Sequence, residues 1–193
     1  MLAAAPAISL ETDADIAPRD ALLDLAFGRA ARLAKTSERL REGRMPAEGL
    51  AFASHGPDGR LVATLRLWHV TAGPGRPALL LGPLAVHPWF RDRGLGGALM
   101  TTAICEAARL GHGAILLVGD APYYTRFGFE TGLTQGLWLP GAFDRSRFLA
   151  LQLVPGALDG ARGLVSPTGK PVELPSLGDL VARGGADEMR RSA

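Results

Sequence analysis

The 193-residue sequence contains a single cysteine, Cys105, so no disulfide can form within the chain. It also lacks any apolar run close to the ~18 residues that a membrane-spanning helix needs, and we expect no membrane partner. The first residues, MLAAAPAISLETDAD, have no basic segment and turn acidic, unlike a secretory signal peptide. These absences favour a cytoplasmic protein. Cys105 lies in an apolar, helix-like stretch, where we expect it to be buried.

A strong charge imbalance is absent as well, because the formal net charge is only +2. Basic residues cluster at 29–44 and 91–93, but aromatic side chains do not alternate with them as stacking platforms for bases. We therefore expect no nucleic-acid partner. Hydrophobic residues make up 47% of the chain and charged residues 21%, as in an ordinary globular protein, and the length fits one domain.

Hydrophobic periodicity predicts a mixed α/β domain in which helices and strands alternate. The spacing of Leu22, Leu25, Ala26 and Leu33 predicts the first helix. The predicted strands lie at 7–13, 49–70 (a hairpin turning at 56–59), 78–86, 114–120 and 147–158, and the predicted helices at 20–33, 37–44, 95–109 and 122–127. The order strand, helix, strand across 78–120 indicates a βαβ unit with parallel strands. We expect residues 1–158 to form the domain and 159–193, rich in Gly and Pro, to be an irregular extension.

The apolar segment 78–86, ALLLGPLAV, is typical of a central strand, but Gly82 and Pro83 interrupt it. Proline has no N–H for a ladder, and glycine tolerates unusual dihedral angles. The pair therefore predicts a bulge at which the strand parts from one of its neighbours.

The segment Arg91–Gly96, RDRGLG, follows this strand and opens the next predicted helix. Glycines at 94 and 96 let a ligand approach the backbone, and the first N–H groups of a helix have no helical partners. Together with the helix dipole and the Arg91 and Arg93 charges, they predict an anion site. An arginine-rich loop whose glycines merely ease a turn is the alternative interpretation.

Three strings around this turn decide between the alternatives. The chain contains LGPLAVHP, GDAPYYTRFGF and a late VPGAL, in this order, together with the pattern Arg91-x-x-Gly94-x-Gly96 and a Tyr124 four residues before Gly128. In these features it resembles the GCN5-related N-acetyltransferase (GNAT) family, and more closely a bacterial subgroup of predicted N-acetyltransferases. The resemblance spans roughly residues 7–158.

The resemblance implies a mostly antiparallel sheet with a central, splayed pair of parallel strands, flanked by helices. It implies acetyl-CoA as the acyl donor, an amine acceptor (a small molecule, a peptide or a protein), direct transfer and no metal. Dimers are common in the family, so a homodimer is an open expectation. The residues expected to bind the donor are Leu84, Ala85 and Val86, through main-chain contacts with pantetheine, and Arg91, Asp92, Arg93, Gly94, Leu95 and Gly96, around the pyrophosphate.

Tyr124 occupies the position of the family tyrosine that assists the departing thiolate, so the resemblance implies a catalytic role. A phenol pKa near ~10 and a thiol pKa near ~8.5 make full proton transfer uphill by about 2 kcal/mol, so a strong hydrogen bond is expected. Packing against the sheet is the alternative role. The neighbouring Tyr123 projects elsewhere and is a weaker candidate.

A general base is not evident, because the strand 78–86 has no carboxylate or histidine. His69, His87 and Asp120 are the candidates, each with a structural alternative, which for Asp120 is a helix cap. A water chain is equally compatible with the sequence. The second predicted helix carries four charged residues, Glu38, Arg39, Arg41 and Glu42. They can bind a charged acceptor or form a solvated helix surface. We expect packing roles for Trp68, Trp89 and Trp138.

Two other functions remain open at this point. A non-catalytic acyl-CoA-binding or regulatory module would keep the turn without needing a base, although it would not need the Tyr124 phenol. A binder of another phosphorylated ligand, such as a nucleotide, would also use the turn.

Overall fold

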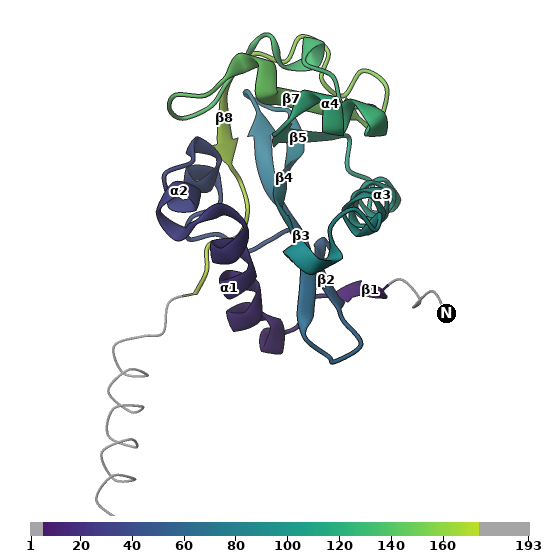
Figure 1. The fold of residues 1–193 in the computed structure, drawn as a ribbon. Coiled ribbons are helices and arrows are strands. Elements are labelled where there is room, and N and C mark those ends of the chain that lie inside the picture. Colours follow the sequence, from purple (N-terminus) through teal and green to yellow (C-terminus); the bar gives the residue numbers. More distant parts are fainter. Residues whose placement is uncertain (1–5, 174–193) are drawn as a thin grey trace, which may run out of the picture.

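The computed structural model describes residues 6–173, which form one sheet with helices on both faces (Figure 1). The strands are β1 (Ile8–Leu10), β2 (Ala51–His55), β3 (Leu61–Ala72), β4 (Pro77–Val86), β5 (Ala114–Val118), β6 (Leu137–Trp138), β7 (Phe148–Gln152) and β8 (Gly163–Pro167). The helices are α1 (Ile16–Phe27), α2 (Arg29–Leu33), α3 (Leu95–Arg109) and α4 (Ala121–Tyr124). Short 3-10 turns lie at Asp13–Asp15, Thr36–Leu40, Pro88–Phe90, Thr125–Phe127, Gly132–Thr134 and Arg145–Arg147.

The main path through the sheet runs β1-β2-β3-β4-β5-β7, and β8 pairs with β3 and β6. The strands of this path are antiparallel except β4 and β5, which are parallel and joined by α3. This confirms the predicted class, a mixed and mostly antiparallel sheet with a central parallel pair, and it confirms the hairpin and the βαβ unit.

The central strands are apolar throughout because both of their faces are covered. In β4, Leu79 and Leu81 face one core cluster, whereas Ala78 and Leu80 face another. This alternation follows from the period of two in a strand. A fully buried leucine contributes about 2 kcal/mol by leaving water, so these leucines stabilise β4 within the sheet.

The helix α3 covers the first face (Figure 1). The face of Ala78 and Leu80 is covered by Leu40 and by the chain from β6 to β8, and α1 covers only the far end of β4. The buried residues of α3 recur at helical spacing and are Leu95, Leu99, Met100, Ala103 and Ala107. The α1 residues Leu22 and Leu23 pack near the far end of β4, against Ala85. The two helices therefore stand on opposite sides of the strand end that follows the bulge.

Two features of the helices differ from the sequence predictions. Leu25 and Leu33 are exposed, because the chain turns at Gly28, where φ is +72°, and α1 and α2 do not share one apolar stripe. Cys105 is exposed, since it lies on the face of α3 opposite the core. Because its side chain is in water, the expectation of a buried cysteine is wrong.

The expected irregular extension contains a strand, β8, which pairs with the end of β3 at Val165 and Ser166. The strand was not predicted because it is short and has Gly163 and Pro167, residues typical of turns, at its ends. The division of the chain at residue 158 stays a prediction, and residues 174–193 of the proposed extension lie outside the described residues. Among the helices of residues 6–173, none is both long and apolar enough to cross a membrane.

Candidate functional site

The parallel pair β4 and β5 separates halfway along β4. The two strands pair only at Leu79 with Ile115 and Leu80 with Leu116. Beyond this point the register between β4 and β3 shifts across Gly82-Pro83, as a bulge requires. The predicted bulge and the predicted parting of the strands are both confirmed. A gap therefore opens on the β5 side of β4.

A side-chain hydrogen bond holds the bulge. The buried Trp68 indole N–H donates to the Gly82 carbonyl across 2.7 Å, so this oxygen is satisfied from within the sheet. Gly82 has a φ of +118°, which favours glycine, and a Cβ at this position would lie 3.9 Å from Nη1 of Arg41. The expected packing role of Trp68 is therefore confirmed, and its indole also fixes a main-chain oxygen.

Beyond the bulge, β4 turns alternate main-chain groups toward the gap. The His87 N–H donates to the Val62 carbonyl across 2.8 Å. In an antiparallel ladder, every second residue hydrogen-bonds the neighbouring strand through its main-chain groups, and the residues between point theirs the other way. Since His87 bonds β3, Val86 and Leu84 direct their N–H and C=O groups away from β3. Nε of Arg91 donates to the Val86 carbonyl across 3.4 Å, which agrees with that direction. By the same alternation Ala85 directs its groups toward β3.

The turn before α3 exposes unpaired amides. Gly94 is the helix N-cap in the left-handed region, with a φ of +78°, and its carbonyl accepts from the Ala98 N–H across 2.9 Å. The N–H groups of residues 95–97 precede this first helical bond and have no backbone acceptor among residues 6–173. Residues 91–94 are exposed, as the anion-site prediction requires.

A cavity of about 460 Å³ adjoins these amides. It is lined by Val86, Phe90, Arg91, Asp92, Gly94, Leu95, Gly96, Gly97, Tyr123 and Arg126. Within the described part of the chain, neither Arg91 nor Arg126 forms an ion pair, and the Arg126 guanidinium lies 4.4 Å from the centre of the Tyr123 ring. Sequence reasoning missed Arg126, although it stands in the same PYYTRF string as Tyr124.

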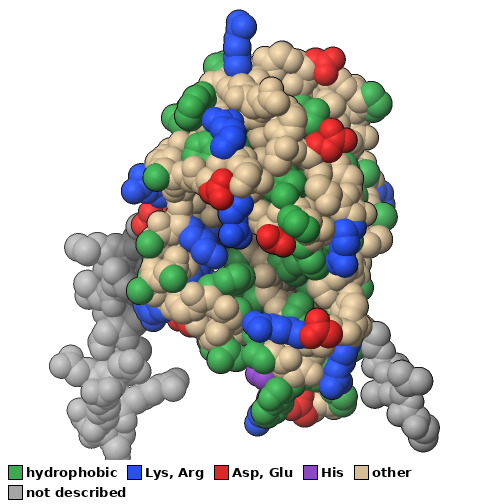
Figure 2. Space-filling model, turned by 45° about the horizontal axis from the view of Figure 1, so that its top comes forward, with side chains coloured by type: hydrophobic (Ala, Val, Ile, Leu, Met, Phe, Trp, Pro, Cys, Tyr) green, Lys and Arg blue, Asp and Glu red, His purple; other side chains and the backbone are tan. Residues whose placement is uncertain are grey.

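A second cavity, of about 370 Å³, lies along the parted strands. It is lined by Phe27, Arg32, Lys35, Ser37, Arg41, Leu81, Gly82, Pro83, Leu84, Val118, Gly119, Asp120, Tyr123, Tyr124 and Arg147. Tyr123 lines both cavities, so the two form neighbouring parts of one cleft. Figure 2 shows a face hollowed near its centre, with apolar side chains in the hollow and Lys and Arg side chains around it.

Tyr124 lies in the second cavity, against the end of β5. Its ring packs over Gly119, where the Cβ of any other residue would overlap the ring. Burial, followed by the nearby Tyr123, raises the pKa of Tyr124 to about 12. The phenol is therefore held as a neutral O–H donor.

Only one of the three candidate bases lies in the cleft. Asp120 lines the second cavity with Tyr124. It occupies the N-cap of α4, as its structural alternative predicts, although its carboxylate makes no capping hydrogen bond. His69 instead faces His112, with ring centres 5.4 Å apart, and Nδ1 of His87 accepts from the Trp89 N–H across 3.4 Å. Neither histidine lines the two cavities.

The charged residues of segment 36–42 separate into two groups. Arg41 is only 7% exposed and lines the second cavity. Arg39 instead donates to the Pro140 carbonyl across 2.8 Å, and Glu42 is exposed. Sequence reasoning missed the other cations of this cavity, Arg32, Lys35 and Arg147, because no local pattern links Arg147 to segment 32–41, more than 100 residues away.

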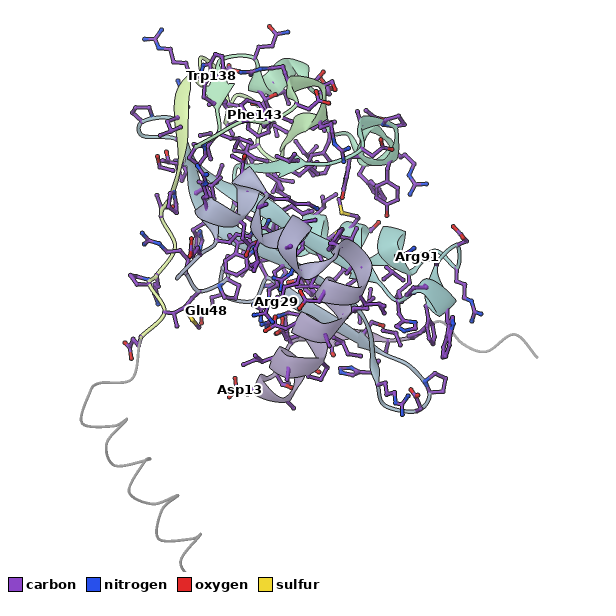
Figure 3. The ribbon with its side chains drawn as sticks, turned by 60° about the vertical axis from the view of Figure 1, so that its left-hand side comes forward. Asp13, Arg29, Glu48, Arg91, Trp138 and Phe143 are labelled. Atoms are coloured by element: carbon purple, nitrogen blue, oxygen red, sulfur yellow. The ribbon has the colours of Figure 1, made fainter. Side chains whose placement is uncertain are left out.

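The expected packing roles of two tryptophans are wrong. Trp89 is 77% exposed, and Trp138 is 59% exposed. Figure 3 shows Trp138 beside Phe143 at the top of the molecule, away from Arg91. Trp138 also lies 4.5 Å from the Arg145 guanidinium and does not line either cavity. Within residues 6–173, no three His, Cys, Asp or Glu side chains gather as potential metal ligands.

Comparison with known proteins agrees with this geometry. The acetyltransferase (GNAT) domain family matches residues 48–131. The uncharacterized N-acetyltransferase YhbS of Escherichia coli (strain K12) is 30% identical over 159 residues, covering 82% of this chain and 93% of YhbS. The crystal structure of E. coli YhbS in complex with CoA is similar with a TM-score of 0.70 at 28% identity, covering 84% of this chain and 89% of that chain.

A second solved structure shares the fold at lower identity. The GNAT-family acetyltransferase of Brucella melitensis, in complex with acetyl-CoA, has a TM-score of 0.62 at 23% identity, covering 85% of this chain and 96% of that chain. The sheet that parts at β4, the exposed turn before α3 and the extent of the YhbS match lead to one assignment. The chain belongs to the GNAT family of acetyl-CoA-dependent N-acetyltransferases.

Proposed function

We propose that this protein transfers the acetyl group of acetyl-CoA to a primary amine by direct attack within the cleft between β4 and β5. The observation that carries the proposal is the unpaired edge of β4 leading to the exposed amides of α3. A pantetheine arm is long, uncharged and rich in amides, so it can pair with such an edge as an added strand. The pyrophosphate at its end suits the helix terminus.

The donor-binding roles divide between main-chain and charged groups. Leu84 and Val86 offer N–H and C=O groups to pantetheine, and Ala85 supports them through its pairing with β3. The segment 91–96 surrounds the pyrophosphate, with the free amides at the start of α3 as donors and Arg91, Arg93 and Arg126 adding positive charge. E. coli YhbS has been crystallised with CoA, which supports CoA as the ligand of this cleft.

The reaction requires one bond to form and one to break. The neutral amine nitrogen attacks the thioester carbonyl carbon, the C–N bond forms, and the C–S bond breaks to release the CoA thiolate. An amide on β4 that stabilises the oxyanion contributes about 3 kcal/mol. The amine loses one proton and the thiolate gains one, so the step conserves protons.

Tyr124 assists the thiolate as a hydrogen-bond donor. With its pKa at about 12, compared with ~8.5 for a thiol, full transfer of its proton is uphill by about 5 kcal/mol. We therefore propose that the proton that ends on the CoA thiol comes from solvent or from the amine, and not from Tyr124. Asp120 is the candidate acceptor for the amine proton, directly or through water, because it lines the same cavity.

Acetyl-CoA turnover with a panel of primary amines, measured by CoA release, tests the proposal. Acceptor-dependent release supports it, whereas tight CoA binding without turnover on any amine would indicate a binding or regulatory module. Competition by ATP equal to that by CoA would instead indicate a nucleotide site. A cytoplasmic location, where an acetyl-CoA-dependent enzyme finds its donor, belongs to this proposal, and a homodimer stays a prediction.

A further inference from the structure

The second cavity is unusually rich in positive charge. Four cationic side chains line it and form a basic cluster, Arg32, Lys35, Arg41 and Arg147. One carboxylate, Asp120, lines the same cavity. None of the lining residues belongs to α3 or to the turn before it, so this cluster is separate from the arginines beside the pyrophosphate site.

The positive charge of the cluster is only partly neutralised. Arg32 binds Asp24 through two hydrogen bonds of 3.0 and 2.7 Å. The Arg41 guanidinium donates twice to Ser37 and lies 3.4 Å from a Glu38 oxygen.

The other two members have no such partner. Within residues 6–173, no carboxylate lies within 4.0 Å of the Lys35 amine or the Arg147 guanidinium. Partial burial lowers the pKa of Lys35, repulsion from Arg41 and Arg147 lowers it further, and the nearby Glu38 offsets part of this effect. The cations therefore destabilise one another, and a bound anion would relieve this repulsion.

The acyl donor does not supply that anion. In the proposed function the pyrophosphate of acetyl-CoA lies at the turn before α3, where Arg91, Arg93 and Arg126 stand. The pantetheine arm and the thioester that extend along β4 carry no charge. The basic cluster lies beyond them, beside Tyr124 and the reacting end of the donor.

Resting on the proposed function, we infer that the acceptor is a small amine that also carries an anionic group, a carboxylate or a phosphate, bound by Lys35, Arg41 and Arg147. The amine end lies toward Asp120 and Tyr124, where attack on the thioester takes place. A cavity of about 370 Å³ suits a small molecule. Guanidinium groups bind both carboxylates and phosphates through paired hydrogen bonds, so the geometry specifies the charge that both share.

Matched amines test the inference. β-Alanine is compared with propylamine, and phosphoethanolamine with ethanolamine, so that each pair differs in its anionic group. Each compound is assayed by CoA release and by calorimetric binding to the CoA-saturated protein. We expect the anionic member to show at least tenfold higher kcat/KM or affinity, a difference of about 1.4 kcal/mol. The two pairs also separate a preference for carboxylate from a preference for phosphate.

Variants locate the anion. Lys35→Met and Arg147→Gln should each raise the KM or Kd of the preferred anionic amine about tenfold while leaving the acetyl-CoA KM unchanged. Lys170→Met is the matched control, because Lys170 is the other lysine of the chain, is exposed, and lines neither cavity.

The outcomes distinguish failure of this inference from failure of the proposed function. Equal or better turnover of the uncharged amines overturns the anionic acceptor and leaves the acetyltransferase function standing. A rise in acetyl-CoA KM in Lys35→Met or Arg147→Gln assigns the cluster to the donor and also overturns the inference. If no amine is acetylated, the proposed function fails, and calorimetry still decides whether the cavity prefers anionic amines.

Discussion

The two ends of the cleft are built in different ways. The end beside α3 presents the free main-chain N–H groups of one continuous segment, residues 95–97, next to the exposed turn 91–94. The opposite end presents side chains from segments as distant as Arg32 and Arg147. The first end suits a ligand that every family member shares, because any sequence with the right turn supplies amides. The second end can change with single substitutions, so it is the part that fits the acceptor specific to this protein.

The largest effect is expected from Tyr124, which lines the second cavity next to Tyr123. Tyr124→Phe removes the donor for the leaving thiolate and should lower kcat about 100-fold, with little change in either KM. Steady-state kinetics with both substrates varied would measure this. Tyr123→Phe removes the neighbouring hydroxyl and should lower kcat less. A change in acetyl-CoA KM alone would place Tyr124 in donor binding and break the proposed division.

A smaller effect is expected from the backbone of the donor end. Gly94→Val places a β-branched residue at a φ of +78° and should distort the turn, weakening CoA binding at least about tenfold by calorimetry. The acceptor KM should stay the same. Gly75→Val is the matched control, because Gly75 also has a positive φ, +70°, and open space around it, in a loop away from the cleft. Unchanged CoA affinity in Gly94→Val would remove the phosphate-turn assignment.

The smallest effect is expected from alkaline pH. Burial raises the pKa of Tyr124 to about 12, so only about 1% of the phenol would be ionised at pH 10 in the folded protein. Titration of Tyr124 should therefore lower kcat less than about twofold between pH 8 and pH 10. A fall in kcat with an apparent pKa near ~10 that disappears in Tyr124→Phe would contradict this.

The same raised pKa has a consequence for stability. The unfolded chain ionises its tyrosines near pH ~10, before Tyr124 ionises in the folded protein. Tyr124 therefore lowers the free energy of unfolding as pH rises from about 10 to about 12, and has no such effect below pH ~10. In Tyr124→Phe, the free energy of unfolding, measured by denaturant titration at several pH values, should fall less steeply between pH ~10 and pH ~12 than in the unmodified protein.

The difference between the two ends of the cleft also explains which parts of the site the sequence could predict. Arg91, Gly94 and Gly96 stand within six residues, and the Gly82-Pro83 pair interrupts an apolar run, so local patterns were sufficient for the turn and the parting strands. Tyr124 was found only through the resemblance to the family. Its packing over Gly119 depends on how α4 meets β5.

Lys35 and Arg147 were missed because their meeting in the second cavity depends on the fold rather than on spacing. Arg126 was missed because its approach to the turn before α3 likewise depends on the fold. Exposure was also misjudged at Cys105 and Trp89, since apolar character alone does not determine which side of a helix or turn faces the core.

The hydrogen bond from Trp68 to the Gly82 carbonyl has a consequence for how the donor binds. Because a buried indole already occupies this oxygen, the bulge is stabilised in the free protein and does not wait for a ligand to form it. The cleft is thus preorganised, and binding needs little rearrangement of β4. A protein built in this way can exchange spent CoA for acetyl-CoA without refolding its central strand.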